Sequence, residues 1–150
     1  MKISSKGRYA LRLMVDIAEN AGKGCISIRD AAERQGISGK YLEQIVSQLT
    51  RAKLLRSVRG AKGGYTLTKP AEEYTAGEIL RVIEGNLAPV ACLVDDVNAC
   101  ERAQSCQTLG FWQGLQKAVD AYVDSVTLHD LLKSAQADSR RRAETAYLLD

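Results

Sequence analysis

The chain has 150 residues, of which 45% are hydrophobic and 26% are charged. This length can enclose one hydrophobic core but is too short for several independent domains. No apolar run reaches the 18 residues of a membrane span, and residues 1–6 lead into an amphipathic segment rather than the apolar core of a signal peptide. We therefore expect a soluble, cytoplasmic protein.

The net charge of +3 is divided unevenly along the chain. Residues 1–70 hold 14 Lys and Arg against 5 Asp and Glu, a net charge of +9, whereas residues 71–150 hold 7 against 13, a net charge of −6. A basic half predicts contact with a polyanion, nucleic acid above all. A solvated basic face without a partner is the alternative.

The first half of the chain predicts three helices. Apolar residues recur every three or four positions between Lys6 and Asn20, as on one face of a helix. Ser27 is expected to cap a second helix over 29–35, which Gly36 ends, and Ser38 is expected to cap a third with an apolar stripe from Tyr41 to Leu49. Two short helices joined by a tight glycine turn describe a helix-turn-helix.

Two β-prone runs, 54–59 and 65–69, flank a glycine-rich segment and predict a hairpin. A basic hairpin directly after a helix-turn-helix is the order of a winged helix. A nucleotide phosphate loop is the rival interpretation, but the segment lacks the Gly-Lys-Ser/Thr ending and the helix that should follow.

The candidate DNA-contacting residues lie on the third helix and at the hairpin tip. Glu and Gln can bind cytosine and adenine edges in the major groove, and Arg and Lys bring positive charge. An ordinary polar helix surface is the alternative for the helical residues. The candidates are Lys40, Glu43, Gln44, Arg59 and Lys62.

Three of the four cysteines share one loop, predicted over residues 86–106, after a helix that Thr75 caps and Gly85 ends. Their pattern, Cys92-x7-Cys100-x5-Cys106, lacks the Cys-x-x-Cys spacing of zinc ribbons. Three thiolates suit an iron–sulfur cluster with one other ligand, and redox thiols or zinc remain the alternatives. Cys25 is expected to be a structural thiol.

A long helix is predicted from Thr108 to about Ser125. Its apolar stripe includes Trp112, Leu115 and Val119, which a small domain that already has a core has no room to cover. We therefore expect it to be a dimerisation helix.

The motifs resemble those of the IscR-type family of dimeric winged-helix transcription regulators. The resemblance runs from residue 1 to about 133. It implies a homodimer crossed through the long helix, which represses or activates transcription, and a cysteine loop that holds an iron–sulfur cluster, [2Fe–2S] more often than [4Fe–4S]. The segments that match are 3–10, 35–38 with 41–44, 58–60 with 63–65, and 127–128. Cys92, Cys100 and Cys106 stand where that family places its cysteine ligands.

The sequence departs from this pattern at the fourth ligand. Leu109 stands where the family's biogenesis regulators have a histidine, and Arg8 and Arg12 stand where some relatives have an acidic ligand. The fourth ligand therefore stays open among Asp95, Asp96, Glu101, Gln107 and an external thiol. The segments 2–4 and 75–79 are equally similar to cysteine-metabolism repressors, which have no cluster.

The sequence thus predicts a mainly α fold with a small β hairpin. The expected parts are a winged helix-turn-helix domain (1–85), a cluster loop (86–106), a dimerisation helix (107–133) and a polar tail (134–150). The expected function is a regulator that binds a two-fold-related DNA site under control of the cluster. A cluster-free repressor that senses redox or sulfur status through thiols or a protein partner is the alternative, and no catalytic constellation indicates an enzyme.

Overall fold

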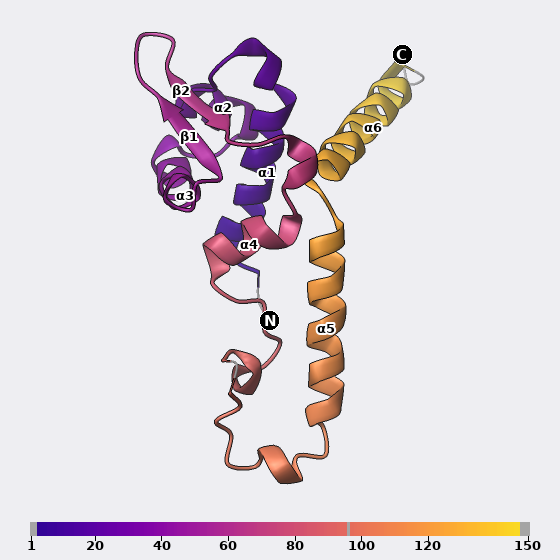
Figure 1. The fold of residues 1–150 in the computed structure, drawn as a ribbon. Helices are drawn as coiled ribbons and strands as arrows, with labels where there is room; N and C mark the ends of the chain where they lie inside the picture. The colour runs from indigo at the N-terminus through magenta and orange to yellow at the C-terminus, as the bar shows by residue number, and fades with distance from the viewer. Residues whose placement is uncertain (1–2, 96, 148–150) are drawn as a thin grey trace.

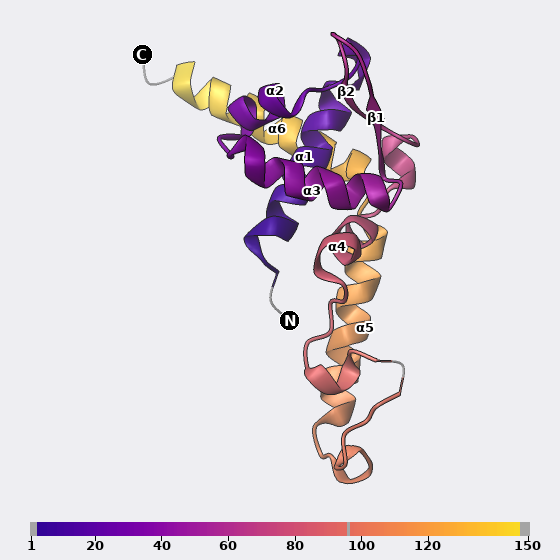
Figure 2. The same cartoon turned by 90° about the vertical axis from the view of Figure 1, so that its left-hand side faces the viewer.

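The computed structural model describes residues 3–95 and 97–147, with side chains up to residue 141. A domain of short helices and one hairpin lies at one end, and a long helix with a returning loop extends away from it (Figures 1 and 2). The elements are α1 (Ser5–Glu19), α2 (Ile28–Gln35), α3 (Gly39–Arg51), β1 (Leu55–Val58), β2 (Gly64–Leu67), α4 (Ala76–Glu84), α5 (Leu109–Ser125) and α6 (Leu128–Tyr147), with single 3₁₀ turns at 21–23, 71–73, 91–93 and 103–105.

The helix-turn-helix forms where its capping residues place it. Ser27 and Ser38 accept hydrogen bonds from the backbone N–H groups of Asp30 and Tyr41, at 3.1 and 3.3 Å, and so begin α2 and α3. Gly36 ends α2 in the left-handed conformation that glycine adopts without strain. The predicted fold class, a winged helix with a two-stranded antiparallel hairpin, is confirmed.

The core of the domain gathers around α1. This helix packs against α2, α3, β2, α4 and α6, and its buried face meets the apolar stripe of α3. The fully buried aliphatic side chains of this contact are Leu13, Met14, Ile17, Leu42, Ile45 and Leu49.

The hairpin is tied to the domain at its base. Tyr74 is fully buried, and its hydroxyl donates to the Leu54 carbonyl oxygen at 2.9 Å while it accepts from the N–H groups of Thr68 and Lys69. Ile26 adds two backbone hydrogen bonds to Tyr65, at 2.8 and 3.0 Å, so that it pairs with the hairpin as a one-residue bridge. The sequence did not predict this bridge, because a single paired residue has no periodic pattern.

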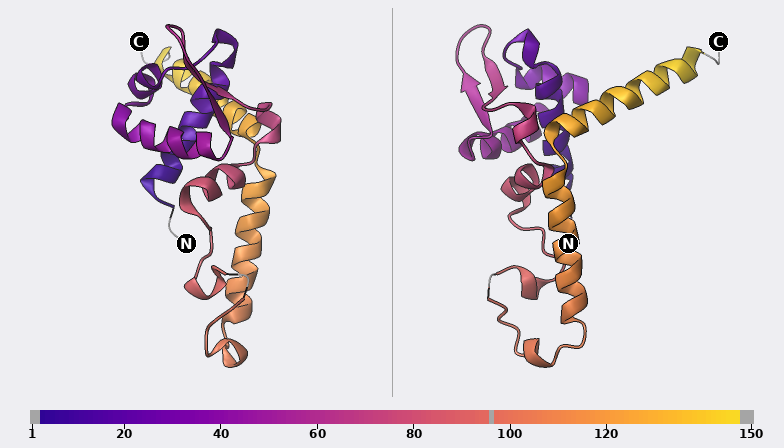
Figure 3. Two further views of the ribbon diagram at one scale, coloured as in Figure 1. Left: turned by 60° about the vertical axis from the view of Figure 1, so that its left-hand side comes forward. Right: turned by 45° about the vertical axis from the view of Figure 1, so that its right-hand side comes forward.

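In the C-terminal third, α5 agrees with the helix predicted from Thr108 to about Ser125. The chain breaks at Val126 and Thr127 and continues as α6, so the segment 107–133 spans α5 and the start of α6. The backbone there bonds to the start of α4: Ala76 N–H donates to the Val126 oxygen, and Leu128 N–H donates to the Tyr74 oxygen. The expected polar tail is helical as far as Tyr147, and α6 projects away from the domain (Figure 3).

Candidate DNA interface and cysteine loop

The exposed face of α3 carries the predicted contact residues. Leu42, Ile45, Val46 and Leu49 bury the opposite face, and the 3.6-residue period therefore turns Lys40, Glu43 and Gln44 to solvent, where all three are exposed. The amphipathic pattern of α3 is what presents these polar groups together.

The hairpin tip places Arg59 and Lys62 in solvent, both exposed. The turn closes through a hydrogen bond from Gly63 N–H to the Gly60 oxygen at 2.9 Å. A Cβ atom at Gly63 would collide with the Val58 carbonyl oxygen, so this tight turn requires glycine. Glycine at this position lets the wing end in a narrow basic tip.

A groove of about 330 Å³ separates α3 from the hairpin. Glu43, Ser47 and Arg51 of α3 line one side, and Ser57 and Tyr65 line the other. The structure thus brings one of the predicted helical residues, Glu43, to the boundary with the wing. The recognition-helix candidate α3 and the wing thus lie next to each other.

Cys92 is less exposed than the other two loop cysteines. It is half-buried in a pocket of about 310 Å³ between the loop and α5, together with Asp95, Gln113 and Lys117. Cys100 and Cys106 are exposed. All three side chains are free thiols.

Hydrogen bonds from Thr108 favour the thiolate form of Cys106. Its Sγ lies 3.6 Å from the Thr108 hydroxyl oxygen, and hydrogen bonds from the side chain and the backbone of Thr108 lower the pKa of the Cys106 thiol below its ordinary value. The thiolate is the nucleophilic and metal-binding form, so this residue is prepared for either chemistry.

The loop has suitable donors for a cluster but does not gather them. Within the described part of the chain, no group of three or more His, Cys, Asp or Glu side chains lies close enough to hold a metal ion. Three thiolates are the ligand type that iron–sulfur clusters use, so the donor chemistry fits and the loop would have to close to use it. Asp95 shares the pocket of Cys92, Glu101 and Gln107 are exposed, and Asp96 lies outside the described residues.

Helix α4, which precedes the loop, is fixed to the C-terminal part of α5, the helix that follows the loop. Arg81 of α4 donates to Asp124 at 2.6 Å and to Asp120 at 2.7 Å, both on α5, and these carboxylates raise the pKa of Arg81. At the other end of α4, the buried Gly77 lets α5 approach, because a Cβ there would lie 2.9 Å from the Val123 Cγ2 atom. The orientation of α5 is thus fixed by α4.

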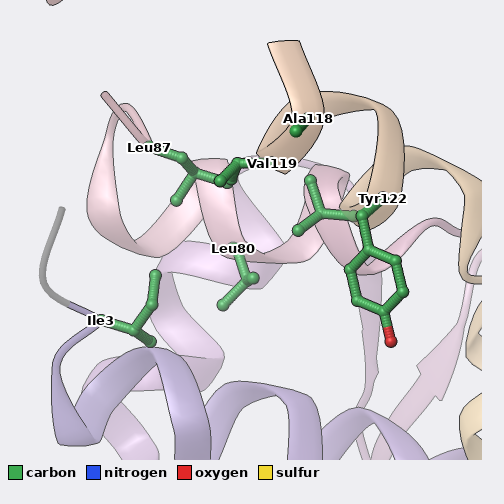
Figure 4. Close-up of a pocket in the computed structure, with 7 residues that line it drawn as sticks. Ile3, Leu80, Leu87, Ala118, Val119 and Tyr122 are labelled. Atoms are coloured by element: carbon green, nitrogen blue, oxygen red, sulfur yellow. The ribbon is translucent and has the colours of Figure 1, made fainter. Parts of the chain in front are cut away.

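An apolar pocket of about 370 Å³ lies where α4, α5 and the N-terminal segment meet (Figure 4). Along α5 itself, no described residue is buried within the single chain, and Phe111 and Tyr122 are 65% and 71% exposed. The stripe containing Trp112, Leu115 and Val119 is only partly covered.

Sequence reasoning missed two polar contacts that organise the domain. Asp16, 3% exposed, accepts two hydrogen bonds from Arg34, at 2.7 and 2.9 Å, and so joins α1 to α2. Glu84 bonds to Ser4 across 80 residues of sequence. An acid on an apolar helix face was a signal for Asp16, whereas nothing local marks Glu84.

A helix-turn-helix with a wing, extended by a long apolar helix, defines the class of winged-helix DNA-binding transcription regulators. The chain belongs to the Rrf2 family, described as an iron-dependent transcriptional regulator, whose model matches residues 3–134. No helix in the described ranges is long and apolar enough to cross a membrane.

The relatives include both kinds of regulator that the sequence resembles, IscR-type regulators and a cysteine regulator. The chain is 39% identical over 148 residues to the HTH-type transcriptional regulator CymR of Bacillus subtilis, covering 99% of this chain and 100% of the relative. The solved structure of CymR, the global cysteine regulator of B. subtilis, matches with a TM-score of 0.74 at 40% identity over 89% of this chain and 98% of that chain. IscR of T. potens matches with a TM-score of 0.70 at 38% identity over 90% and 88%. These relatives are named transcription regulators and not enzymes.

Proposed function

We propose that the protein is a homodimeric regulator that binds a two-fold-related DNA site through α3 and the wing, and that the three loop cysteines control this binding. The observation behind the DNA contact is the joint exposure of Lys40, Glu43 and Gln44 beside a wing with Arg59 and Lys62 at its tip. The +9 charge of residues 1–70 supplies attraction to phosphates.

The dimer is supported by the partly exposed apolar stripe of α5. Trp112, Leu115 and Val119 form an apolar surface next to the apolar pocket at α4, and a second copy offers the matching surface in an isologous contact. Two domains joined in this way present two α3 helices to adjacent half-sites.

The test of DNA binding begins with a duplex selected by the protein from a random library. Affinity measured by fluorescence anisotropy should fall with salt at a log–log slope of about −0.9 per phosphate contacted. R59A should weaken binding by about 1–3 kcal/mol, whereas R102A, which removes an exposed arginine of the cysteine loop, should leave it unchanged. Q44A should alter the selected sequence more than the nonspecific affinity.

A flat salt response would overturn the DNA-binding proposal. If R59A and Q44A both bind like the parent protein, the contact surface lies elsewhere on the domain.

For the control site, we propose an iron–sulfur cluster held by Cys92, Cys100 and Cys106. A bound cluster would supply a centre that oxidation can change or destroy. The three thiolates on one loop support this assignment, as does the family's description as iron-dependent. In this proposal, the loop closes to bring its exposed thiols toward Cys92.

A cluster-free regulator is the second candidate, and two observations favour it. The described part of the loop does not gather its thiols, and the hydrogen bonds from Thr108, which lower the pKa of the Cys106 thiol, favour thiol–disulfide chemistry. The similarity to a cysteine regulator points the same way.

Anaerobic purification separates the two chemistries. A cluster predicts a coloured protein with roughly equal iron and sulfide, whose colour is lost in C92A, C100A and C106A but kept in C25A. A colourless parent protein whose DNA affinity responds to diamide and dithiothreitol establishes the thiol candidate instead. In either case the affinity should change by about 1–3 kcal/mol between states, as is usual for allosteric coupling.

A further inference from the structure

The first turn of α1 has an incomplete local cap. Ser4 is the N-cap residue, and its hydroxyl oxygen accepts from Gly7 N–H at 3.2 Å. In a capping box, the residue three positions after the cap returns a side-chain oxygen to the N–H of the cap residue. Here that residue is Gly7, which has no side chain, so local sequence leaves half of the box unmade.

Glu84, the last residue of α4, supplies the missing half. Its Oε1 accepts from the Ser4 N–H at 3.1 Å and from the Ser4 hydroxyl at 2.7 Å. A Cβ on Gly7 would collide with the Glu84 carboxylate. The glycine therefore makes the space that Glu84 fills, and the capping box of α1 is completed from another helix.

Within α4 the same carboxylate is poorly placed. It lies at the C-terminal end of the helix, where the helix dipole disfavours negative charge, whereas at the N-terminus of α1 the dipole favours it. The carboxylate of Glu84 is therefore favourable for the N-terminus of α1 and unfavourable for the C-terminus of its own helix, α4.

Glu84 also stands at the entrance of the cysteine loop. Gly85 ends α4 with a positive φ of 84°, and Leu87, 3% exposed, is the first buried residue beyond it. Leu87 lines one apolar pocket with Leu80 and with Ile3, the neighbour of Ser4 (Figure 4). A displacement at the start of the loop therefore acts directly on the contact between Glu84 and Ser4.

From its first turn, α1 reaches the DNA-binding elements. Tyr9 stacks edge-to-face on Tyr41 of α3, with ring centres 5.8 Å apart. Arg12 donates to the Gln35 side chain and backbone at 3.0 and 2.8 Å, at the end of α2. The position of α1 thus affects both helices of the helix-turn-helix.

We propose that Glu84 is a positioning residue that couples the cysteine loop to the helix-turn-helix, by completing the capping box of α1 only while the start of the loop stays in place. This inference rests on the proposed function, in which the loop is the control site. The coupling runs through a contact that does not touch DNA or the cysteines.

Two variants separate coupling from simple stabilisation. E84A removes the carboxylate, and G7E/E84A returns a glutamate to the local capping-box position, in the space that Glu84 vacates. E78A is the matched control, because it removes an acid from the first turn of α4 that pairs with Lys69 instead. Each full-length protein is prepared with reduced thiols, after diamide oxidation, and after anaerobic reconstitution with iron and sulfide.

The first readout is hydrogen exchange of the α1 first-turn amides without DNA. In the parent protein and in E78A, exchange should differ by about fivefold between at least two loop states, the size expected for losing a helix cap. In E84A it should be fast in every state, and in G7E/E84A slow in every state. State-dependent exchange that persists in E84A, or exchange that never varies in the parent protein, would overturn the inference.

The second readout is affinity for the selected duplex in the same states. E84A and G7E/E84A should lose the state dependence that the parent protein and E78A show. If the affinity of the parent protein is the same in all states while α1 exchange still responds to the loop, the proposed control of DNA binding fails and the Glu84 contact stands.

Discussion

At the scale of single residues, Thr108 lowers the pKa of the Cys106 thiol. The hydrogen bonds from Thr108 stabilise the Cys106 thiolate, and the side chain is exposed. T108V keeps the shape of the side chain but removes the hydroxyl, and it should therefore raise the thiol pKa and slow alkylation of Cys106 by iodoacetamide at neutral pH. Mass spectrometry of the labelled peptides gives the rate.

Cys100 provides the internal control in that experiment, because it is exposed on the same loop without a contact to Thr108. Its alkylation rate should not change in T108V. Equal slowing of both cysteines would show that the substitution alters the loop rather than the thiolate.

Individual residues also show what local sequence can and cannot predict. Ser27, Gly36 and Ser38 act within three residues of themselves, so the helix-turn-helix was predictable from the sequence. The partner of Glu84 is 80 residues distant, and neither end carries a local signal. The cysteine pattern predicts ligand type, but the separation of the three thiols depends on the loop conformation.

At the scale of elements, the packing of α5 on α4 depends on Gly77. G77A places a methyl group against Val123 and the Arg81 and Asp124 side chains, so it should destabilise the fold by about 1 kcal/mol or more. G114A is the matched change on α5, where nothing lies within 4 Å, and helix propensity predicts a gain of up to about 1 kcal/mol. Urea denaturation measures both, and the same sign for the two would contradict this account of the packing.

The start of α6 has a complete local capping box. Thr127 N–H and hydroxyl donate to the Asp130 carboxylate at 3.0 and 2.7 Å, and Asp130 N–H donates back to the Thr127 oxygen. The Thr127 hydroxyl and N–H lower the pKa of Asp130. Because the folded pKa is lowered, this contribution to stability is present above the ordinary Asp pKa of about 3.9 and is lost as pH falls through the folded value.

We therefore expect the first turn of α6 to fray in acid. We compare the protection of the amides of residues 128–131 against hydrogen exchange with that of the α1 amides, by NMR from pH 7 to pH 3. The protection of residues 128–131 should fall at the acid end relative to that of α1. D130N should remove this pH dependence. Parallel acid behaviour of α1 and α6 in the parent protein would mean that global unfolding, and not the cap, is observed.

The same capping box separates α6 from α5. Thr127-x-x-Asp130 is a helix-start pattern, and it lies just beyond the helix predicted from Thr108 to about Ser125. Beyond Ser134 the helix has no apolar stripe. Its Ala, Arg and Gln residues favour a helix by intrinsic propensity, which a search for amphipathic pattern does not detect.

At the scale of the whole molecule, the stripe on α5 predicts the oligomeric state. L115D places a charge in the middle of the apolar surface and should convert a dimer to a monomer in sedimentation velocity, with loss of most of the specific DNA affinity because two half-sites are no longer bound as one unit. A121D adds the same charge on an exposed position of α5 outside the stripe and should remain dimeric. A dimer that survives L115D would place the interface elsewhere.

The contact of Gly77 and Arg81 with α5, called here the α4 clamp, fixes one end of the long helix, so that α5 acts as a lever. Its 17 residues span about 25 Å, and Gly77 and Arg81 hold only the end nearest the domain (Figure 1). A rotation of about 5° at this fulcrum would move the far end by about 2 Å, more than half the rise of one base pair. In the proposed dimer, the angle between the two α5 helices would therefore set the spacing between DNA half-sites that the protein can bind. A substitution confined to the α4 clamp would change that spacing without altering any residue that faces the duplex.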